Sequence, residues 1–152
     1  MSVAYVTPRT TTVRDVAGSH VRSIRCVGAV VFDHTGRLLL IRRVNDPGKG
    51  RWSVPGGRVE TDENDHQAVL REVAEETGLD VEITGHTGCV QLPAAEGAVF
   101  DIHDYACRVL GGTLHAGDDA DDVRWCDAAT LTVLPVVDGL IEALTDWNCM
   151  PR

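Results

Sequence analysis

Apolar residues recur along this chain in runs separated by glycine-rich or charged breaks. Residues 24–32 and residues 37–43 are rich in aliphatic side chains and flank a polar turn at residues 33–36, a combination that predicts a β-hairpin. Strand composition returns in three further segments, at residues 81–91, 99–110 and 122–126. The pattern therefore predicts a set of strands, of which the first two are paired.

The breaks between the predicted strands carry turn and cap residues. Residues 93–97 contain proline and glycine and separate two strands, and the pair Gly111 and Gly112 predicts another turn. Asp127 is placed to cap a brief turn, and Pro135 is expected to open a final helix. Apolar residues follow helical spacing in that last segment, at Val137, Leu140, Ile141 and Leu144.

One longer helix is predicted in the middle of the chain, at residues 65–77. Asn64 is a suitable N-cap, and Gln67 three residues later completes a capping box. Gly78 can adopt the left-handed conformation that ends a helix without steric cost. These start and stop signals define the helix more clearly than its apolar stripe does.

Three carboxylates share one face of that helix. At about 100° per residue, Glu75 and Glu76 lie about 60° and about 40° to either side of Glu72 around the axis. Like charges this close destabilise a helix, so we expect the cluster to face a cation. Carboxylate oxygens suit hard divalent cations, and magnesium keeps part of its coordination shell for water and phosphate oxygens. The helix therefore predicts the metal centre of an enzyme that acts on phosphate compounds.

The helix follows a loop rich in proline and glycine at residues 52–60, and the two segments together form a spaced motif. Gly57 is followed after five residues by Glu63 and after seven more by Arg71-Glu72-Val73-Ala74-Glu75-Glu76-Thr77-Gly78-Leu79. This motif resembles the Nudix box, G-x5-E-x7-R-E-U-x-E-E-x-G-U, in which U is a bulky aliphatic residue, and all nine defining positions match. A solvated acidic helix would need neither the loop nor Glu63 at its set distance.

The resemblance to the Nudix family implies a fold, a cofactor and a reaction. The implied fold is an α/β/α sandwich with a mixed central sheet and the catalytic loop-helix. Glu72, Glu75 and Glu76 are the implied catalytic residues and metal ligands, together with the backbone carbonyl of Gly56, and the metal is magnesium or, as an alternative, manganese. The implied reaction is hydrolysis of the diphosphate bond in a nucleoside diphosphate linked to another group, with water attacking phosphorus.

Three more residues take roles from the resemblance. Arg71 is expected to hold a catalytic carboxylate by an ion pair, since its guanidinium fork fits a carboxylate, and Glu63 is expected to brace the junction of loop and helix. Asp119, in the acidic segment at residues 117–122, is the candidate for a further metal ligand or the general base. A solvated acidic turn is an equally good interpretation of that segment, and relatives often carry glutamate there.

Arginines concentrate just before and inside the loop, where they are candidates for binding substrate phosphates. Arg42, Arg43 and Arg58 are the expected substrate-binding residues, although exposed loop cations also serve solubility. The net charge of −9 argues against a nucleic-acid polymer as partner, because binding to its backbone needs clustered Lys and Arg. The expected substrate is therefore a small nucleotide.

The motif does not select one nucleotide. ADP-ribose-like compounds and nucleoside triphosphates both stay open, and Pro93, shortly after Leu79, gives slight support to the first class. Trp52, Phe100 and Tyr105 are the aromatic residues that we consider for stacking on a base. A catalytically inactive, nucleotide-binding sensor is the alternative function, but such proteins usually lose glutamates of the box, and this chain keeps them all.

Length and composition fit one domain. The 152 residues, 43% of them apolar, can fill a single core that we expect within residues 21–152, while residues 1–20 are expected to form a flexible or loosely docked arm. Five scattered cysteines without a C-x-x-C pair argue against a disulfide scaffold or a zinc site. Without a signal-peptide core or a membrane-length apolar run, a cytoplasmic location is expected, and the resemblance leaves a homodimer open.

Overall fold

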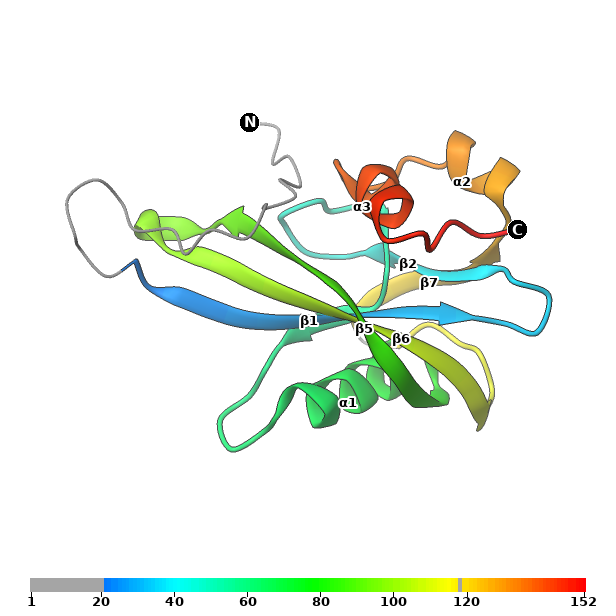
Figure 1. Cartoon of the computed structure of the whole chain (residues 1–152), viewed down its shortest axis with the longest axis horizontal. Helices are drawn as coiled ribbons and strands as arrows, with labels where there is room; N and C mark the ends of the chain where they lie inside the picture. The colour runs from blue at the N-terminus through cyan, green and yellow to red at the C-terminus, as the bar shows by residue number, and fades with distance from the viewer. Residues whose placement is uncertain (1–20, 118) are drawn as a thin grey trace.

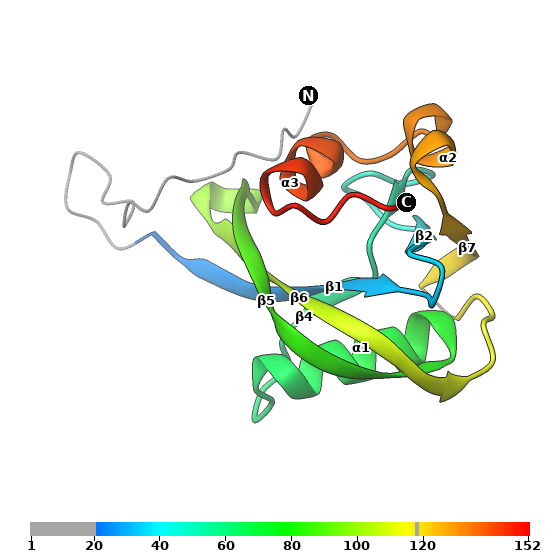
Figure 2. The same ribbon diagram turned by 45° about the vertical axis from the view of Figure 1, so that its right-hand side comes forward.

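The computed structural model describes residues 21–117 and 119–152 and places one sheet between helices (Figure 1). The elements follow the chain in the order β1 (Ser23–Phe32), β2 (Leu38–Arg43), β3 (Trp52–Ser53), β4 (Gly56–Arg58), α1 (Asp65–Thr77), β5 (Leu79–Pro93), a 3-10 turn (Ala95–Gly97), β6 (Val99–Gly112), β7 (Ala120–Cys126), α2 (Ala128–Val133) and α3 (Leu140–Asp146). Helix α1 lies on one side of the sheet, and α2 and α3 lie on the other (Figures 1 and 2). The predicted α/β/α sandwich is confirmed, whereas the arm predicted at residues 1–20 lies outside the described residues.

The sheet is mixed, as expected, because β1 pairs with β6 in parallel and with β2 and β4 antiparallel. Its strand order is β3-β2-β1-β6-β5, with β4 paired to β1 and β7 paired to β2. The predicted hairpin is confirmed as β1 and β2, and the other predicted strands form the greater part of β5, β6 and β7. The central position of β1 brings β4 and β6 to either side of one strand, which is where the candidate site forms.

Helix α1 has the bounds that its cap residues predict. The side chain of Asn64 accepts from the backbone amide of Gln67 at 2.8 Å, and the side chain of Gln67 accepts from the amide of Asn64 at 2.9 Å, so the capping box is complete. Gly78 ends the helix with φ of 75°, in the left-handed region. Both ends are therefore held by local interactions, which fixes the register of the acidic residues between them.

Two apolar clusters hold the helices onto the sheet. Because side chains alternate along a strand, β1 sends Val27 and Val31 to the α1 face and Val30 to the opposite face. Val73 of α1 belongs to the first cluster, and Leu144 of α3 belongs to the second. Burying each such aliphatic side chain stabilises the fold by roughly 1.5–3 kcal/mol, so both helix layers are anchored by the same central strand.

The prediction that Pro135 opens a helix is wrong. The carbonyl of Pro135 accepts from the amide of Trp52 at 2.9 Å, and the amide of Val137 donates to the carbonyl of Trp52 at 2.9 Å. These bonds keep the segment extended beside β3, and α3 begins only at Leu140, after Gly139 with φ of 83°. Tertiary pairing has overridden the helical spacing of the apolar residues.

The predicted turn at Gly111 and Gly112 is also wrong, because both residues belong to β6 and pair with Asp80 and Leu79 of β5. The strands β3 and β4 were not predicted, since each is too short to show an alternating pattern. The cap at Asp127 is confirmed, and its side chain accepts from the amide at the third residue of α2 at 2.8 Å.

Candidate active site

Two glycines bring the loop before α1 against β1 and against the acidic helix. Strand β4 runs antiparallel to β1, with Gly56 opposite Gly28 and Gly57 opposite Val27. A Cβ atom on Gly56 would collide with the carbonyl oxygen of Val27, and one on Gly57 would collide with the carboxylate of Glu72. A side chain at Gly56 would clash with fixed backbone, and one at Gly57 would displace the Glu72 carboxylate, so the glycine pair lets the loop backbone touch the helix carboxylates.

Glu72 and Glu76 form a buried carboxyl pair at this contact. Their exposed fractions are 8% and 3%, and Oε2 of Glu76 has no hydrogen-bond partner within the described part of the chain. Burial, followed by the hydrogen bond with Glu72 and the charge of Glu72, raises the pKa of Glu76 to about 9; the amide of Gly56 and the charge of Arg43 act in the other direction. The pair therefore retains a proton at neutral pH unless a cation neutralises it.

Arg71 links the carboxylates of the motif. Its guanidinium donates to both oxygens of Glu63 at 2.7 and 2.9 Å, to Glu72 at 2.9 Å and to Glu75 at 3.2 Å. It also donates to the backbone carbonyl of Arg58 at 3.0 Å, which ties the loop to the helix. The hydrogen-bonded ion pair between Arg71 and Glu63 lowers the pKa of the Glu63 carboxyl group to about 2. The contacts match the bracing geometry expected of Arg71 and Glu63, and their catalytic importance stays a prediction.

The donor set of the carboxyl pair fits a divalent cation, although the three predicted glutamates do not converge on one point. Among the residues that the structure describes, no three His, Cys, Asp or Glu side chains form a group that could hold a metal ion as they stand. Glu75 is turned toward Arg71, and its side chain is 54% exposed. The fit rests on the oxygen atoms of Glu72 and Glu76, one of them buried and unpartnered in the described chain. A ligand role for Glu75 would require its side chain to leave Arg71.

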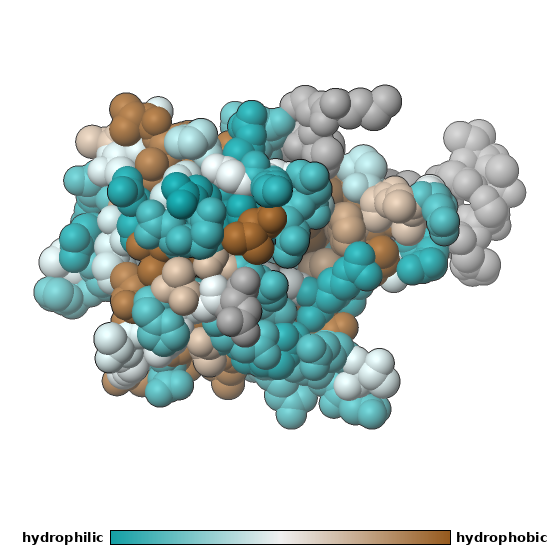
Figure 3. All heavy atoms as spheres, turned by 180° about the vertical axis from the view of Figure 1, so that it is seen from behind, coloured by the Kyte–Doolittle hydropathy of each residue, from teal (hydrophilic) through white to brown (hydrophobic). Residues whose placement is uncertain are grey.

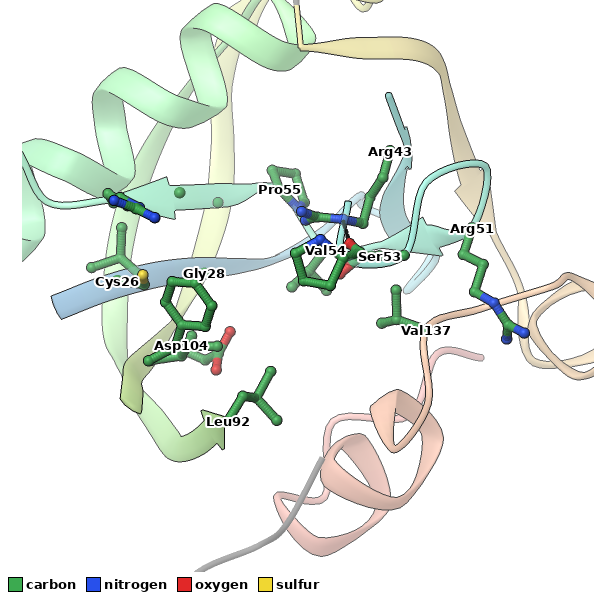
Figure 4. A pocket seen from close by; sticks show the side chains of 18 of the residues that line it. Cys26, Gly28, Arg43, Arg51, Ser53, Val54, Pro55, Leu92, Asp104 and Val137 are labelled. Carbon is green, nitrogen blue, oxygen red and sulfur yellow. Dashed lines mark hydrogen bonds between the residues drawn. The ribbon is translucent and has the colours of Figure 1, made fainter. Parts of the chain in front are cut away.

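A cavity of about 730 Å³ adjoins the loop that carries Gly56 and Gly57, which we call the glycine loop (Figure 4). Arg43, Arg51 and Arg58 contribute positive charge to its lining, and Phe100 contributes an aromatic ring. The guanidinium carbon of Arg58 lies 5.6 Å from the centroid of the Phe100 ring. Figure 4 shows Arg43 reaching toward Pro55 of the loop, while Arg51 points away from the centre. The volume lies in the range of small-ligand sites. The lining also contains Asp46, Asp104 and Asp138, and Asp138 is ion-paired with Arg51 at 3.6 Å, so Arg43 and Arg58 are the candidate contacts for an anion.

Asp104 is a buried carboxyl group on the cavity wall that the sequence analysis missed. It lies on β6 opposite Gly28, and a Cβ atom added to Gly28 would collide with the Asp104 carboxylate. Its exposed fraction is 3%, and burial raises its pKa to about 7. Figure 4 shows the carboxylate pointing between Gly28 and Leu92 into the cavity. The available signal was a charged residue in phase with Phe100 and Ile102 on one face of a strand.

Other predicted residues lie outside the cavity lining. Arg42 forms an ion pair with an aspartate of β7, and its guanidinium carbon lies 5.8 Å from the ring centroid of Trp52. Trp52 is 4% exposed and belongs to the core beneath α3. Tyr105 packs on the α1 face, and its hydroxyl donates to Asp65 at 2.6 Å. Of the three aromatic residues considered for base stacking, Phe100 is the one that lines the cavity.

Asp119 is exposed in the turn before β7. Two residues earlier, the amide of Gly117 donates to the carbonyl of Glu76 at 3.0 Å, and the amide of Ala120 donates to the carbonyl of Gly117 at 3.3 Å. The turn therefore lies beside the C-terminal part of α1, next to the helix that carries the glutamates. The metal or base role of Asp119 stays a prediction.

The rest of the described surface has few apolar features. Its exposed large hydrophobic side chains are Leu70, Leu110 and Val133, which lie on three different elements. On the face drawn in Figure 3, hydrophilic side chains predominate and hydrophobic ones gather in separate patches. No helix within the described ranges has the length and apolar character needed to cross a membrane. The cavity is thus the strongest candidate for ligand binding.

Comparison with known proteins finds both sequence relatives and structural neighbours. The family model described as NUDIX domain matches residues 22–146. The chain is 38% identical over 106 residues to an ADP-ribose pyrophosphatase of Methanocaldococcus jannaschii, a match that covers 68% of this chain and 62% of that protein. It is 30% identical over 121 residues to a CTP pyrophosphohydrolase of Escherichia coli, with 77% and 88% covered.

A solved structure shares the fold. The MutT protein from Methanosarcina mazei Go1 superposes with a TM-score of 0.74 at 22% identity, and the match covers 86% of this chain and 96% of that one. The chain thus spans nearly the whole of this structural neighbour, but less than two thirds of the length of the Methanocaldococcus jannaschii relative.

Proposed function

The chain belongs to the Nudix family, and on that basis we propose that it hydrolyses the diphosphate bond of a nucleoside diphosphate linked to another group. One observation carries the proposal: the buried carboxyl pair of Glu72 and Glu76 contacts Gly56 and Gly57, which also line the cavity together with Arg43 and Arg58. A site for a cation and a site for phosphates therefore adjoin each other. Hydrolysis of a diphosphate requires that arrangement, because charge must be neutralised where the phosphorus–oxygen bond breaks.

The proposed ligands of a divalent cation are Glu72, Glu76 and the carbonyl of Gly56, with Glu75 as a further ligand once released from Arg71. Magnesium is the proposed metal and manganese the alternative, since both accept oxygen ligands. When bound, such a cation polarises phosphoryl oxygens and lowers the pKa of bound water. The chain itself holds the carboxylates in place: the amide of Gly56 donates to Glu76, and Arg71 holds Glu72 at 2.9 Å.

The proposed phosphate contacts are Arg43 and Arg58, because both line the cavity beside the glycine loop. Arg42 is a weaker candidate, since it is already paired with a carboxylate of β7 and lies outside the lining. Asp119 is the proposed base or additional metal ligand, supported by the position of its turn beside α1. To act as the base, the Asp119 carboxylate would have to reach the oxygen of the attacking water.

Two substrate classes are proposed: ADP-ribose-like compounds and nucleoside triphosphates. The ADP-ribose pyrophosphatase of Methanocaldococcus jannaschii supports the first class, and the CTP pyrophosphohydrolase of Escherichia coli supports the second. Both classes combine a base with a diphosphate, which the lining of arginines and Phe100 could accommodate.

The test is product analysis of the purified protein with magnesium and a panel of ADP-ribose, the common nucleoside triphosphates and an oxidised guanine triphosphate. We expect release of a nucleoside monophosphate from at least one compound, abolished by chelation of the metal. Glu75→Gln should lose most of this activity, whereas Glu142→Gln, an exposed position on α3, should keep it. Metal-dependent binding of a panel compound without product would contradict the proposal and identify a nucleotide sensor.

A further inference from the structure

Asp104 is a group on the cavity wall for which the proposed hydrolysis has no use. We propose that its carboxyl group reads the base of the bound nucleotide and selects bases that carry an exocyclic amino group. This inference rests on the proposed function in one respect, namely that the cavity binds a nucleotide. It adds the substrate class that the Nudix box leaves open.

The burial of the Asp104 side chain without a partner is the first argument. The backbone of Asp104 is paired within the sheet, and its carbonyl also accepts from the hydroxyl of Thr87 at 3.0 Å. Its Oδ2 atom, in contrast, finds no hydrogen-bond donor among the described residues. A buried polar atom left unpaired costs about 1–3 kcal/mol, so a carboxyl group in this position needs a compensating contact. Asp104 lines the cavity, so a small rotation of its side chain would bring this buried oxygen to a ligand that can supply that contact.

The position of Asp104 relative to the glycine loop is the second argument. Gly28 of β1 pairs with Gly56 on one side and with Asp104 on the other. Neighbouring strands lie about 4.8 Å apart, so the backbones of Gly56 and Asp104 are separated by roughly 10 Å. A nucleotide whose phosphates meet the loop would therefore cross Gly28 with its sugar and reach Asp104 with its base. Gly28 leaves this path open, because any larger residue would collide with the carboxylate.

The surroundings of Asp104 suit a flat aromatic ligand. Phe100 and Ile102 lie on the same strand and line the same cavity, and Leu92 of β5 adds a further apolar wall. The guanidinium of Arg58 now lies over the Phe100 ring, and once it turns to the phosphates the ring becomes a surface on which a base can stack. Apolar walls fix the plane of a base, and a single carboxyl group in that plane determines which edge is accepted.

The chemistry of a carboxyl group favours an amino group on that edge. In its ionised form it accepts hydrogen bonds from N–H groups and has no hydrogen to donate to a carbonyl oxygen; in its protonated form it donates to either a ring nitrogen or a carbonyl oxygen, so the discrimination belongs to the ionised form. A carbonyl oxygen at the same place of the base would face a second acceptor and leave both unpaired. A buried polar site therefore strongly disfavours a base with a carbonyl oxygen at that position, whereas it would tolerate a base with an extra methyl group.

Calorimetric titration with nucleoside monophosphates at about pH 8.5, where the ionised form of the Asp104 carboxyl group predominates, tests this inference without requiring hydrolysis. CMP and UMP differ by an amino group against a carbonyl oxygen, and so do AMP and IMP. We expect the wild-type protein to bind the amino member of each pair about tenfold or more tightly. Asp104→Asn, which offers both a donor and an acceptor, should reduce that ratio to about twofold or less.

Asp101→Asn is the matched control, because Asp101 is on β6 but faces the opposite side and is ion-paired with Arg25 at 3.1 Å. It should leave the ratio unchanged, and circular dichroism should show all three proteins folded. Equal binding of the paired ligands by the wild type, absence of binding to all four, or an unchanged ratio in Asp104→Asn would each overturn the inference. Loss of hydrolysis on the substrate panel, with the binding ratio intact, would refute the proposed function alone.

Discussion

Two buried acidic sites lie on either side of β1, and they differ in what surrounds them. On the β4 side, Glu72 and Glu76 are held by Arg71, their neighbour on the helix, and by the amide of Gly56, which the pairing of β4 with β1 brings to them. On the β6 side, Asp104 is buried in a cavity wall that Phe100, Ile102 and Leu92 share, and its Oδ2 atom has no hydrogen-bond partner in the described part of the chain. The first site is a network of helix neighbours joined to the preceding loop, and the second is a single residue positioned by strand pairing.

The difference separates two tasks that a nucleotide hydrolase must perform. A buried carboxyl pair in which the pKa of Glu76 is raised, with a guanidinium nearby, is suited to binding a cation, because neutralising the pair relieves the cost of burying it. A lone carboxyl group within an apolar wall is suited to recognising an uncharged edge with N–H donors. Cation binding therefore requires charged neighbours, whereas base recognition requires apolar ones, and β1 lies between the two sites.

We call the site of Glu72 and Glu76 the helix side and the site of Asp104 the strand side. The largest effect should come from a substitution on the helix side. Glu75→Gln removes a charge from an exposed position of α1, so we expect the fold to remain and kcat to fall by about 10²–10³-fold at saturating magnesium. Steady-state kinetics with a substrate identified from the panel measures this. Wild-type turnover in the variant would show that the reaction does not need the Glu75 carboxylate, which would contradict its proposed role as a metal ligand.

The strand side should show its effect in stability rather than turnover. The pKa of Asp104 is about 7 in the fold against 3.8 as the ordinary value, so the native state binds more protons than the unfolded chain between those limits. The wild type therefore loses stability as the pH rises from about 4 to about 7. Asp104→Asn should remove that loss and raise the melting temperature at pH 8 by roughly 5 °C, with little change at pH 4. A parallel pH dependence of both proteins would contradict the burial argument.

The bracing role of Arg71 distinguishes the two sites further. Arg71→Lys keeps the charge but cannot bond both oxygens of Glu63 while reaching Glu72, so we expect about tenfold lower activity and a melting temperature lower by a few degrees. Thermal unfolding and kinetics on one preparation test both effects. The matched change Arg37→Lys, in the exposed β1–β2 turn, should leave activity unchanged.

The smallest effects should separate the two adjacent arginines of β2. Arg43 lines the cavity, so Arg43→Ala should raise KM by about three- to tenfold with kcat nearly unchanged. Arg42 is paired with a carboxylate of β7, so Arg42→Ala should leave KM within about twofold. Equal effects of the two substitutions would show that cavity lining does not identify the phosphate contacts.

The helix side was largely predictable from the sequence because its information is local. The cap at Asn64, the stop at Gly78 and the spacing of the glutamates all lie within a few turns of one helix, and the structure has the same bounds. The turned-away side chain of Glu75 was not predictable, since its position depends on how Arg71 divides its donors among several acceptors.

The strand side was not predictable, because strand pairing determines its geometry. Asp104 meets Gly28 across a parallel pair whose members are far apart in the sequence, and no local pattern fixes that register. The failure at Pro135 has the same origin, since its extended backbone pairs with Trp52 of a distant strand. Where the fold depends on local caps, the sequence was informative; where it depends on distant pairing, the structure was required.

The central claim is that the glutamates of α1 drive the reaction while Asp104 selects the base. The most direct test measures kcat and kcat/KM for CTP and UTP, and for ATP and ITP, with the wild type, Glu75→Gln and Asp104→Asn. The account predicts that Glu75→Gln lowers kcat for both members of a pair by the same factor, and that Asp104→Asn keeps kcat but abolishes the preference for the amino member. If Asp104→Asn lowered kcat equally for both members and kept their ratio, the division of tasks between the two sites would be wrong.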